Sequence, residues 1–239
     1  MKNDKTYHFE CIKCGKCCSD KNTIVNLTYT DILRMEYEKK YTLSDFLNFV
    51  GFYMFEEDPT EQQLKQMVVP PIQTENGGAF LGLRKQEDGR CIFLNKHNKC
   101  KIYKARPSIC RTFPFNFHSI ADKSGKKKID IHMRYTEKSL EYCPGISDNS
   151  PEIIAEPWLK DGQQAVKEIL SEHVLIKKWN TAVKEGKITA SAENYLRIIL
   201  NMTDKQKEPS KKPVSETAKK SYQSRLKKKL QQHISEKKK

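Results

Sequence analysis

Two short helices are predicted near the N-terminus, where a threonine precedes an aspartate by three residues and apolar residues follow at helical spacing. The pairs are Thr28 with Asp31 and Thr42 with Asp45. They resemble a capping box, in which each side chain bonds the backbone N–H of the other residue and closes the helix N-terminus. Each pair therefore marks the first turn of a helix.

Apolar and polar residues alternate farther along the chain, and this pattern predicts two hairpins. Residues 79–83 and 91–94 lie on either side of the turn dipeptide Asp88-Gly89 and form the first predicted pair of strands. Residues 115–118 and 129–133 form the second pair.

The apolar spacing becomes helical from Pro157 onward. Apolar side chains keep to one broad face for about five turns, Gly186 offers a stop, and a last helix is predicted near 191–201. Core packing accounts for both apolar faces. The whole pattern predicts an α+β protein: a small, loop-rich cysteine-cluster domain with hairpins and short helices, a helical C-terminal extension, and a tail.

The charge distribution sets the limits of that tail. The 239 residues carry a net charge of +14, but residues 204–239 alone contain 13 Lys or Arg and four Asp or Glu, a net charge of +9. This segment has too little apolar surface to offset its ordering entropy, so we expect a mostly disordered basic tail. The predicted parts are a cysteine-cluster domain at 1–156, a helical extension at 157–203 and the tail at 204–239.

The tail also carries an apolar pattern of its own. Its apolar residues recur at every fourth position, as in an amphipathic helix: Ala218, Tyr222, Leu226, Leu230 and Ile234. Flanked by lysines, such a stripe could order on nucleic acid or on an anionic membrane surface. The plainer interpretation is a solvated tail, because the sequence has no base-reading motif and no interleaved aromatic residues.

The sequence contains no run of about 18 apolar residues, so no transmembrane segment is predicted. The residues after Met1 lack the apolar core of a secretory leader. We therefore expect a cytoplasmic protein, in a reducing compartment where disulfides are rare. The eight cysteines, about 3% of the chain and below the density of disulfide scaffolds, need another explanation.

All eight cysteines fall within the first 143 residues, and four are packed into Cys11-Ile12-Lys13-Cys14-Gly15-Lys16-Cys17-Cys18. A C-x-x-C turn directs two sulfur atoms at one metal, and Gly15 permits the tight turn that brings backbone N–H groups to the sulfur. The other four could complete the sites in space: Cys91, Cys100, Cys110 and Cys143.

Eight thiolates divide into two sites of four, the ligand number of structural zinc and of a 4Fe–4S cluster. One cluster with several bystander cysteines fits the sequence equally well. Arg106 and Arg111 flank the turn from Pro107 to Cys110 and could neutralise an anionic metal–thiolate centre. The strand histidines His118 and His132 are candidates for acid–base roles or for alternative ligands.

Four stretches taken together resemble the CxxCxxCC family of zinc- or iron-chelating domains, also called YkgJ-type. They are Cys11-x-x-Cys14-x-x-Cys17-Cys18, residues 89–94, residues 100–115 with the pattern C-x-I-Y-x-x-R-P-x-x-C-R-x-F-P, and Cys143-Pro144-Gly145. The resemblance implies a metal-chelating domain, of iron–sulfur type above all. A similar cysteine domain occurs in the flagellin lysine methylases.

The predicted function is metal chelation by clustered cysteine thiolates, with an iron–sulfur cluster (4Fe–4S) as the expected cofactor and electron transfer as a compatible role. Two alternatives stay open: a zinc-stabilised structural or interaction domain, and a protein methyltransferase similar to the flagellin methylases. The sequence has no G-x-G-x-x-G, P-loop or H-E-x-x-H motif, so it does not decide whether the protein is an enzyme. The expected partners are the metal and a redox or protein partner that the sequence leaves unidentified.

Overall fold

The computed structural model describes residues 6–55, 57, 60, 69–120 and 130–207. The helices are α1 (Lys16–Ser19), α2 (Tyr29–Lys39), α3 (Leu43–Phe49), the 3₁₀ turn η1 (Tyr103–Ala105), α5 (Ser108–Thr112), α6 (Glu137–Tyr142), α7 (Ala155–Lys184) and α8 (Ala192–Lys207). The strands are β1 (Val50–Met54), β2 (Ile72–Thr74), β3 (Gly77–Leu83), β4 (Phe115–Ile120) and β5 (Asp130–Tyr135). The α+β class is confirmed. All contacts described below lie within the compact unit that ends at Met202.

Both predicted capping boxes are present. The backbone N–H of Asp31 donates to Thr28 Oγ1 at 3.3 Å, and Asp31 Oδ2 accepts from the Thr28 N–H at 3.0 Å. Thr42 and Asp45 make the same reciprocal pair at the start of α3. These bonds satisfy backbone donors that a helix N-terminus otherwise leaves unpaired. Helix α3 ends at Phe49, and the next residue, Val50, opens strand β1.

The prediction of a strand at residues 91–94, the second strand of the first hairpin, is wrong. One edge of β3 pairs with β1, while the other pairs with β2 and then with residues 25–27, so no edge is left for residues 91–94. The chain reverses at Gly89, where φ is +82°. An isolated bridge joins Lys85 and Cys91. The carbonyl oxygens of Cys91 and Leu94 accept hydrogen bonds from a side chain, Gln86 Nε2, at 2.7 and 2.9 Å.

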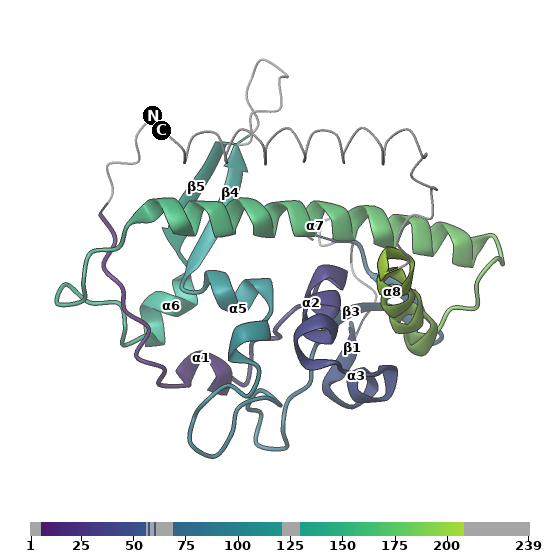
Figure 1. The fold of residues 1–239 in the computed structure, drawn as a ribbon, viewed down its shortest axis with the longest axis horizontal. Helices are drawn as coiled ribbons and strands as arrows, with labels where there is room; N and C mark the ends of the chain where they lie inside the picture. The colour runs from purple at the N-terminus through teal and green to yellow at the C-terminus, as the bar shows by residue number, and fades with distance from the viewer. Residues whose placement is uncertain (1–5, 56, 58–59, 61–68, 121–129, 208–239) are drawn as a thin grey trace, which may run out of the picture. The chain divides into compact units, whose positions relative to one another are not determined.

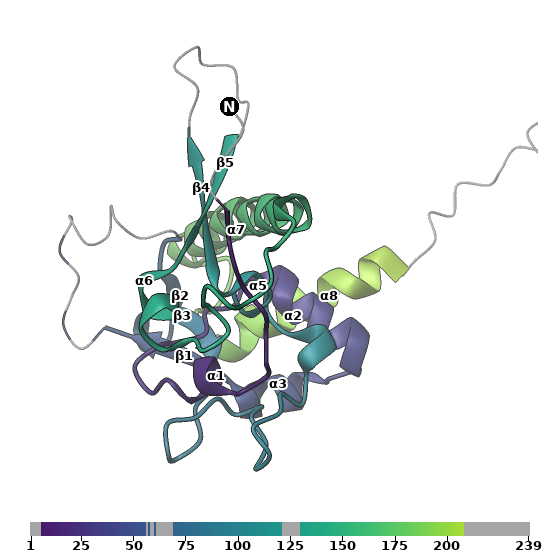
Figure 2. The ribbon, with the colours of Figure 1, turned by 90° about the vertical axis from the view of Figure 1, so that its left-hand side faces the viewer.

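The second predicted hairpin is confirmed as β4 and β5, which pair antiparallel with Phe115 opposite Tyr135. Figure 2 shows the N-terminal segment passing beside this hairpin and α7 on its way to α1. Tyr7 and Phe9 are buried there against Phe115 and Trp158, which form a small aromatic core.

The predicted C-terminal helices are present as α7 and α8, and they belong to the larger of two hydrophobic cores. Ile176, Trp179 and Tyr195 are buried in the same cluster as residues of α2, α3 and β3. Trp179 Nε1 also donates to the carbonyl oxygen of Gln73 in β2 at 2.8 Å. Helix α7 contacts α2, α5, β2, β4 and β5, and so joins α5, which carries Cys110, to the hairpin and to the larger core (Figure 1).

The division at residues 156 and 203 stays a prediction. Residues 208–239 of the predicted tail lie outside the described residues. Within the part of the chain that the structure describes, every helix falls short of the length and apolar composition that a membrane span requires.

Candidate metal centre

The cysteine-rich segment that begins at Cys11 is held between two turns. On one side the Glu10 N–H donates to the carbonyl oxygen of Gly145 at 3.0 Å. On the other side Gly15 lies against the loop at Asn98: a Cβ built on Gly15 would be 3.0 Å from the Cβ of Asn98. Gly15 has φ +75° and Lys13 has φ +55°, so two left-handed residues fold the C-x-x-C-G turn. The single turn of α1, which the sequence did not predict, follows directly.

Backbone hydrogen bonds bring the next three cysteines together. The Cys91 N–H donates to the carbonyl oxygen of Cys18 at 2.8 Å, which places the end of the N-terminal segment beside the Gly89 turn. An isolated bridge between Leu94 and Cys100 then returns the chain to the same place. Cysteines that lie as much as 82 positions apart in sequence therefore meet across the ends of loops.

Cys110 joins this group from α5. Burial raises the pKa of its thiol well above the ordinary value, and the charges of Cys91, Cys17 and Cys100 raise it further. Burial likewise raises the pKa of Cys91 and of Cys100, each with a contribution from Cys17. Cys91, Cys100 and Cys110 therefore lie within electrostatic reach of one another and of Cys17.

Cys143 lies beside the other end of the N-terminal segment. It directly follows α6, which packs on α1, and Lys138 of α6 is paired with Asp20 at 3.0 Å. Burial raises the pKa of Cys143, and the charges of three other cysteines add to the effect, with that of Cys14 largest. Those three cysteines are Cys14, Cys17 and Cys11.

Cys17 and Cys18 stand where the two groups meet. Their Sγ atoms are 3.9 Å apart, within reach of a weak thiol hydrogen bond. That bond lowers the pKa of Cys17 to about 7 and raises the pKa of Cys18, as expected if Cys18 donates and Cys17 accepts as the thiolate. The charges that act on Cys18 come from Cys17, Cys110 and Cys91, whereas Cys17 acts on members of both groups.

By the charges that act on their thiols, the cysteines fall into two groups. The first contains Cys18, Cys91, Cys100 and Cys110. The second contains Cys11, Cys14 and Cys143, with Cys17 beside both groups. All eight are free thiols. Among the described residues, no three side chains of His, Cys, Asp or Glu stand together in an arrangement that could hold a metal ion.

The two arginines of the sequence prediction point in different directions. Arg106 lies over the ring of Tyr103, 4.1 Å from its centroid, and Lys13 Nζ lies 5.4 Å from the same centroid. Desolvation raises the pKa of Cys100, and the charge of Arg106 partly offsets that rise. Arg111 instead pairs with Asp161 of α7, at 3.2 Å, and connects two helices.

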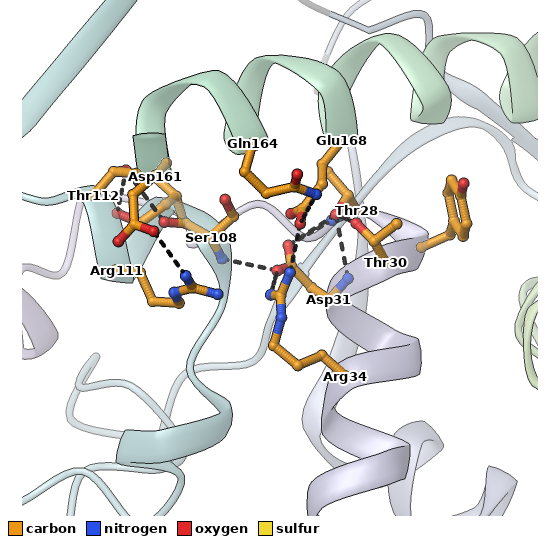
Figure 3. A network of polar contacts seen from close by, with 12 residues as sticks. Thr28, Thr30, Asp31, Arg34, Ser108, Arg111, Thr112, Asp161, Gln164 and Glu168 are labelled. Carbon is orange, nitrogen blue, oxygen red and sulfur yellow. Dashed lines mark hydrogen bonds and ion pairs between the residues drawn. The ribbon is translucent and has the colours of Figure 1, made fainter. Parts of the chain in front are cut away.

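Sequence reasoning missed a buried ionic network next to Cys110 (Figure 3). Asp31 and Glu168 are 1% and 4% exposed, and the guanidinium of Arg34 bonds both, at 2.6 and 2.7 Å. Asp31 also accepts from the N–H of Ser108, the first residue of α5, at 2.8 Å. The sequence signal at Asp31 was the capping box alone. Nothing local reveals that Asp31 meets Ser108, 77 positions away, or that Arg34 meets Glu168, 134 positions away.

Comparison with known proteins agrees with the cysteine pattern. A family model described as a CxxCxxCC putative zinc- or iron-chelating domain matches residues 10–144, a range that contains all eight cysteines. An uncharacterized protein of Methanocaldococcus jannaschii is 34% identical over 145 residues, and the alignment covers 60% of this chain and 60% of the relative. No solved structure matches the chain.

Proposed function

The chain belongs to the family of CxxCxxCC putative zinc- or iron-chelating domains, and we propose that its eight cysteines bind metal in two neighbouring four-thiolate centres, in the form of iron–sulfur clusters. The observation that carries this proposal is the grouping of the thiols. Cys17 completes the second group, so that each group has four members. Zinc in the same thiolate sites is the alternative form.

Electrostatics supports a cation in each group. Burial and mutual repulsion raise the pKa values of Cys91, Cys100, Cys110 and Cys143, so without a cation these thiols resist ionisation. A bound metal ion would favour the ionised form instead, because a thiol that coordinates a metal loses its proton. Crowded thiolates are costly in a protein without a metal, and a bound metal cation offsets their charge.

The adjacency of Cys17 and Cys18 supports two centres rather than one. Neighbouring side chains diverge, and here Cys18 lies with the cysteines of the loops at 91–110 while Cys17 also lies near Cys143. Each centre would have two sources of ligands: the N-terminal segment and one or more distant turns. The charge of Arg106 acts on both Cys17 and Cys100 and would offset the negative charge of the thiolates, and Lys13 lies over the same Tyr103 ring as Arg106.

A cluster held by four thiolates supplies one-electron chemistry at a potential set by charge, hydrogen bonds and exposure. The residues of this chain would bind it, limit the access of water and present it near the surface. Ile12 and Ile109, each next to a cysteine, are 58% and 47% exposed. We therefore propose electron transfer to a partner that docks close to the cysteine segments.

The primary test is anaerobic purification followed by iron, sulfide and zinc analysis and visible absorption. We expect about eight iron atoms and eight sulfides per chain if both centres hold 4Fe–4S clusters, with a broad absorption near 400 nm. A colourless chain that keeps zinc through iron–sulfur reconstitution would show that the thiolate centres hold zinc rather than iron–sulfur clusters. A chain that folds stably and holds neither metal would refute the proposal.

Cysteine substitutions test the division into two centres. Cys91→Ser and Cys143→Ser remove one member of each group and should each lose half of the bound metal. The matched control is Cys91→Ser combined with Cys100→Ser, which stays within one group and should lose no more metal than Cys91→Ser alone. Loss of all metal in each single variant would instead show one centre with bystander cysteines.

A further inference from the structure

The ionic network beside Cys110 connects three helices (Figure 3). Asp31 lies in α2, Glu168 in α7, and Ser108 opens α5. Arg34 Nη1 bonds Asp31 Oδ1 at 2.6 Å and Arg34 Nη2 bonds Glu168 Oε1 at 2.7 Å. One guanidinium thus holds two buried carboxylates from different helices in a fixed fork geometry.

Both oxygens of Asp31 are fully used. Oδ2 accepts the N–H and the hydroxyl of Thr28, both at 3.0 Å, and Oδ1 accepts Arg34 and the N–H of Ser108. Burying a carboxylate to 1% exposure is expensive unless every lone pair is satisfied. The capping box accounts for Oδ2, whereas the two bonds at Oδ1, from Arg34 and from the Ser108 N–H, lie outside it and connect Asp31 to α5.

Helix α5 is the element that needs external positioning. It has only five residues, Ser108–Thr112, far fewer than an isolated helix requires to be stable. Its first N–H is bound by Asp31 at 2.8 Å, and Arg111 near its other end pairs with Asp161 at 3.2 Å. Cys110 lies between these two attachments, so its place follows from them.

We infer that Asp31, held by Arg34 and Glu168, is a positioning residue that sets the place of Cys110 in the first cysteine group by binding the N–H of Ser108. This inference rests on the proposed metal-binding function. Metal ligands are oriented by outer partners, and loss of such a partner typically costs ten- to a hundredfold in metal affinity. Here the partner acts on the backbone of the ligand-bearing helix.

Ser108→Pro removes the N–H and the hydroxyl, and it places the ring Cδ where the N–H pointed at Asp31 Oδ1, so the contact with Asp31 is broken. Proline suits the first position of a helix, and Pro107 already has the extended conformation, ψ 155°, that a following proline requires. Ser108→Ala is the matched control, because it removes the hydroxyl and keeps the N–H. The measurement is Co²⁺ titration of the full-length metal-free chain, followed by the thiolate-to-cobalt and d–d absorption bands, which report affinity and tetrahedral geometry separately.

We expect Ser108→Ala to bind Co²⁺ like the unchanged chain at both centres. Ser108→Pro should bind ten- to a hundredfold more weakly at one centre, with altered d–d bands, while the Cys143 centre stays unchanged and shows that the chain is folded. Equal Co²⁺ affinity and equal spectra in the two variants would overturn the inference. An unchanged chain that binds no Co²⁺, iron or zinc would refute the proposed function instead.

Asp31 variants separate positioning from stability. Asp31→Asn keeps one oxygen for the Ser108 N–H but loses the charge, so it should be less stable toward urea and still show the unchanged cobalt spectrum. Asp31→Ala should be less stable toward urea and should also show an altered cobalt spectrum. If Asp31→Asn and Asp31→Ala shift the spectrum equally, the acceptor oxygen is not what positions Cys110, and the inference fails.

Discussion

The carbonyl oxygen of Glu10 occupies the place where a side chain on Gly145 would begin. A Cβ built on Gly145 would lie only 2.1 Å from that oxygen, and the Glu10 N–H donates to the Gly145 carbonyl at 3.0 Å. The two residues are 135 positions apart in the sequence, and this contact brings Cys11 and Cys143 into the same region.

Gly145→Ala should therefore separate the two segments, because neither backbone can yield as a flexible side chain would. We expect a loss of about 1–3 kcal/mol in the free energy of unfolding and loss of metal from the centre that contains Cys143. Urea unfolding and metal analysis measure the two effects. Gly186→Ala is the control: it adds a Cβ at a positive φ, in open space, and should leave the metal content unchanged.

Gly162→Ala should destabilise the protein although it replaces glycine inside a helix. An exposed helical site would gain about 1 kcal/mol from this change. At Gly162, however, the added Cβ would lie 2.1 Å from Cδ1 of Phe117 in β4, so α7 and the hairpin would be forced apart. We expect a net loss of about 1–3 kcal/mol in urea unfolding. Phe117→Leu in the same chain should recover part of it, and strict additivity of the two changes would contradict the explanation.

Removing Arg34 should be severely destabilising at neutral pH. Arg34→Met leaves the buried carboxylates of Asp31 and Glu168 without their shared cation, a change that typically costs about 3–5 kcal/mol. Burial already raises the pKa of Asp31, so the loss should shrink as pH falls and that carboxylate takes up a proton.

Arg197→Met is the matched control, because its pair with Glu193 is half-exposed and should be worth less than about 1 kcal/mol. Equal losses in the two variants, or a loss from Arg34→Met that does not depend on pH, would contradict this account.

The free energy of unfolding should decrease as the pH rises, because Glu172 is a buried carboxyl group. Burial raises its pKa from 4.5 to about 7, despite hydrogen bonds from the Tyr29 N–H at 2.6 Å and the Tyr195 hydroxyl at 3.0 Å. The folded chain therefore holds a proton there that the unfolded chain releases above about pH 4.5, and stability falls until about pH 7.

Glu172→Gln removes this titration. The measurement is the free energy of unfolding at pH 5, 6 and 8. From pH 5 to pH 8 it should fall by about 3 kcal/mol more in the unchanged chain than in the variant. A difference between the two chains that stays constant with pH would contradict the buried, protonated carboxyl.

Short-range signals account for what the sequence predicted correctly. The pairs Thr28–Asp31 and Thr42–Asp45 act across three residues, and the capping boxes form as expected. The β4–β5 hairpin and the long helix α7 follow from periodicities of two and 3.6 residues. The strand predicted at 91–94 failed because its intended partner, β3, is paired along both edges by segments that the local pattern does not reveal.

The amino-acid sequence is enough to identify the groups available for chemistry: eight thiols in a spacing that identifies a zinc- or iron-chelating family. Which of the cysteine-bearing segments meet depends on the packing of distant parts of the chain. The contacts of Cys18 with Cys91, of Glu10 with Gly145 and of Asp31 with Ser108 each join segments at least 70 residues apart. Helical and strand periods fix neighbours within a few residues, whereas such contacts depend on how helices and turns pack, which no single stretch of sequence specifies.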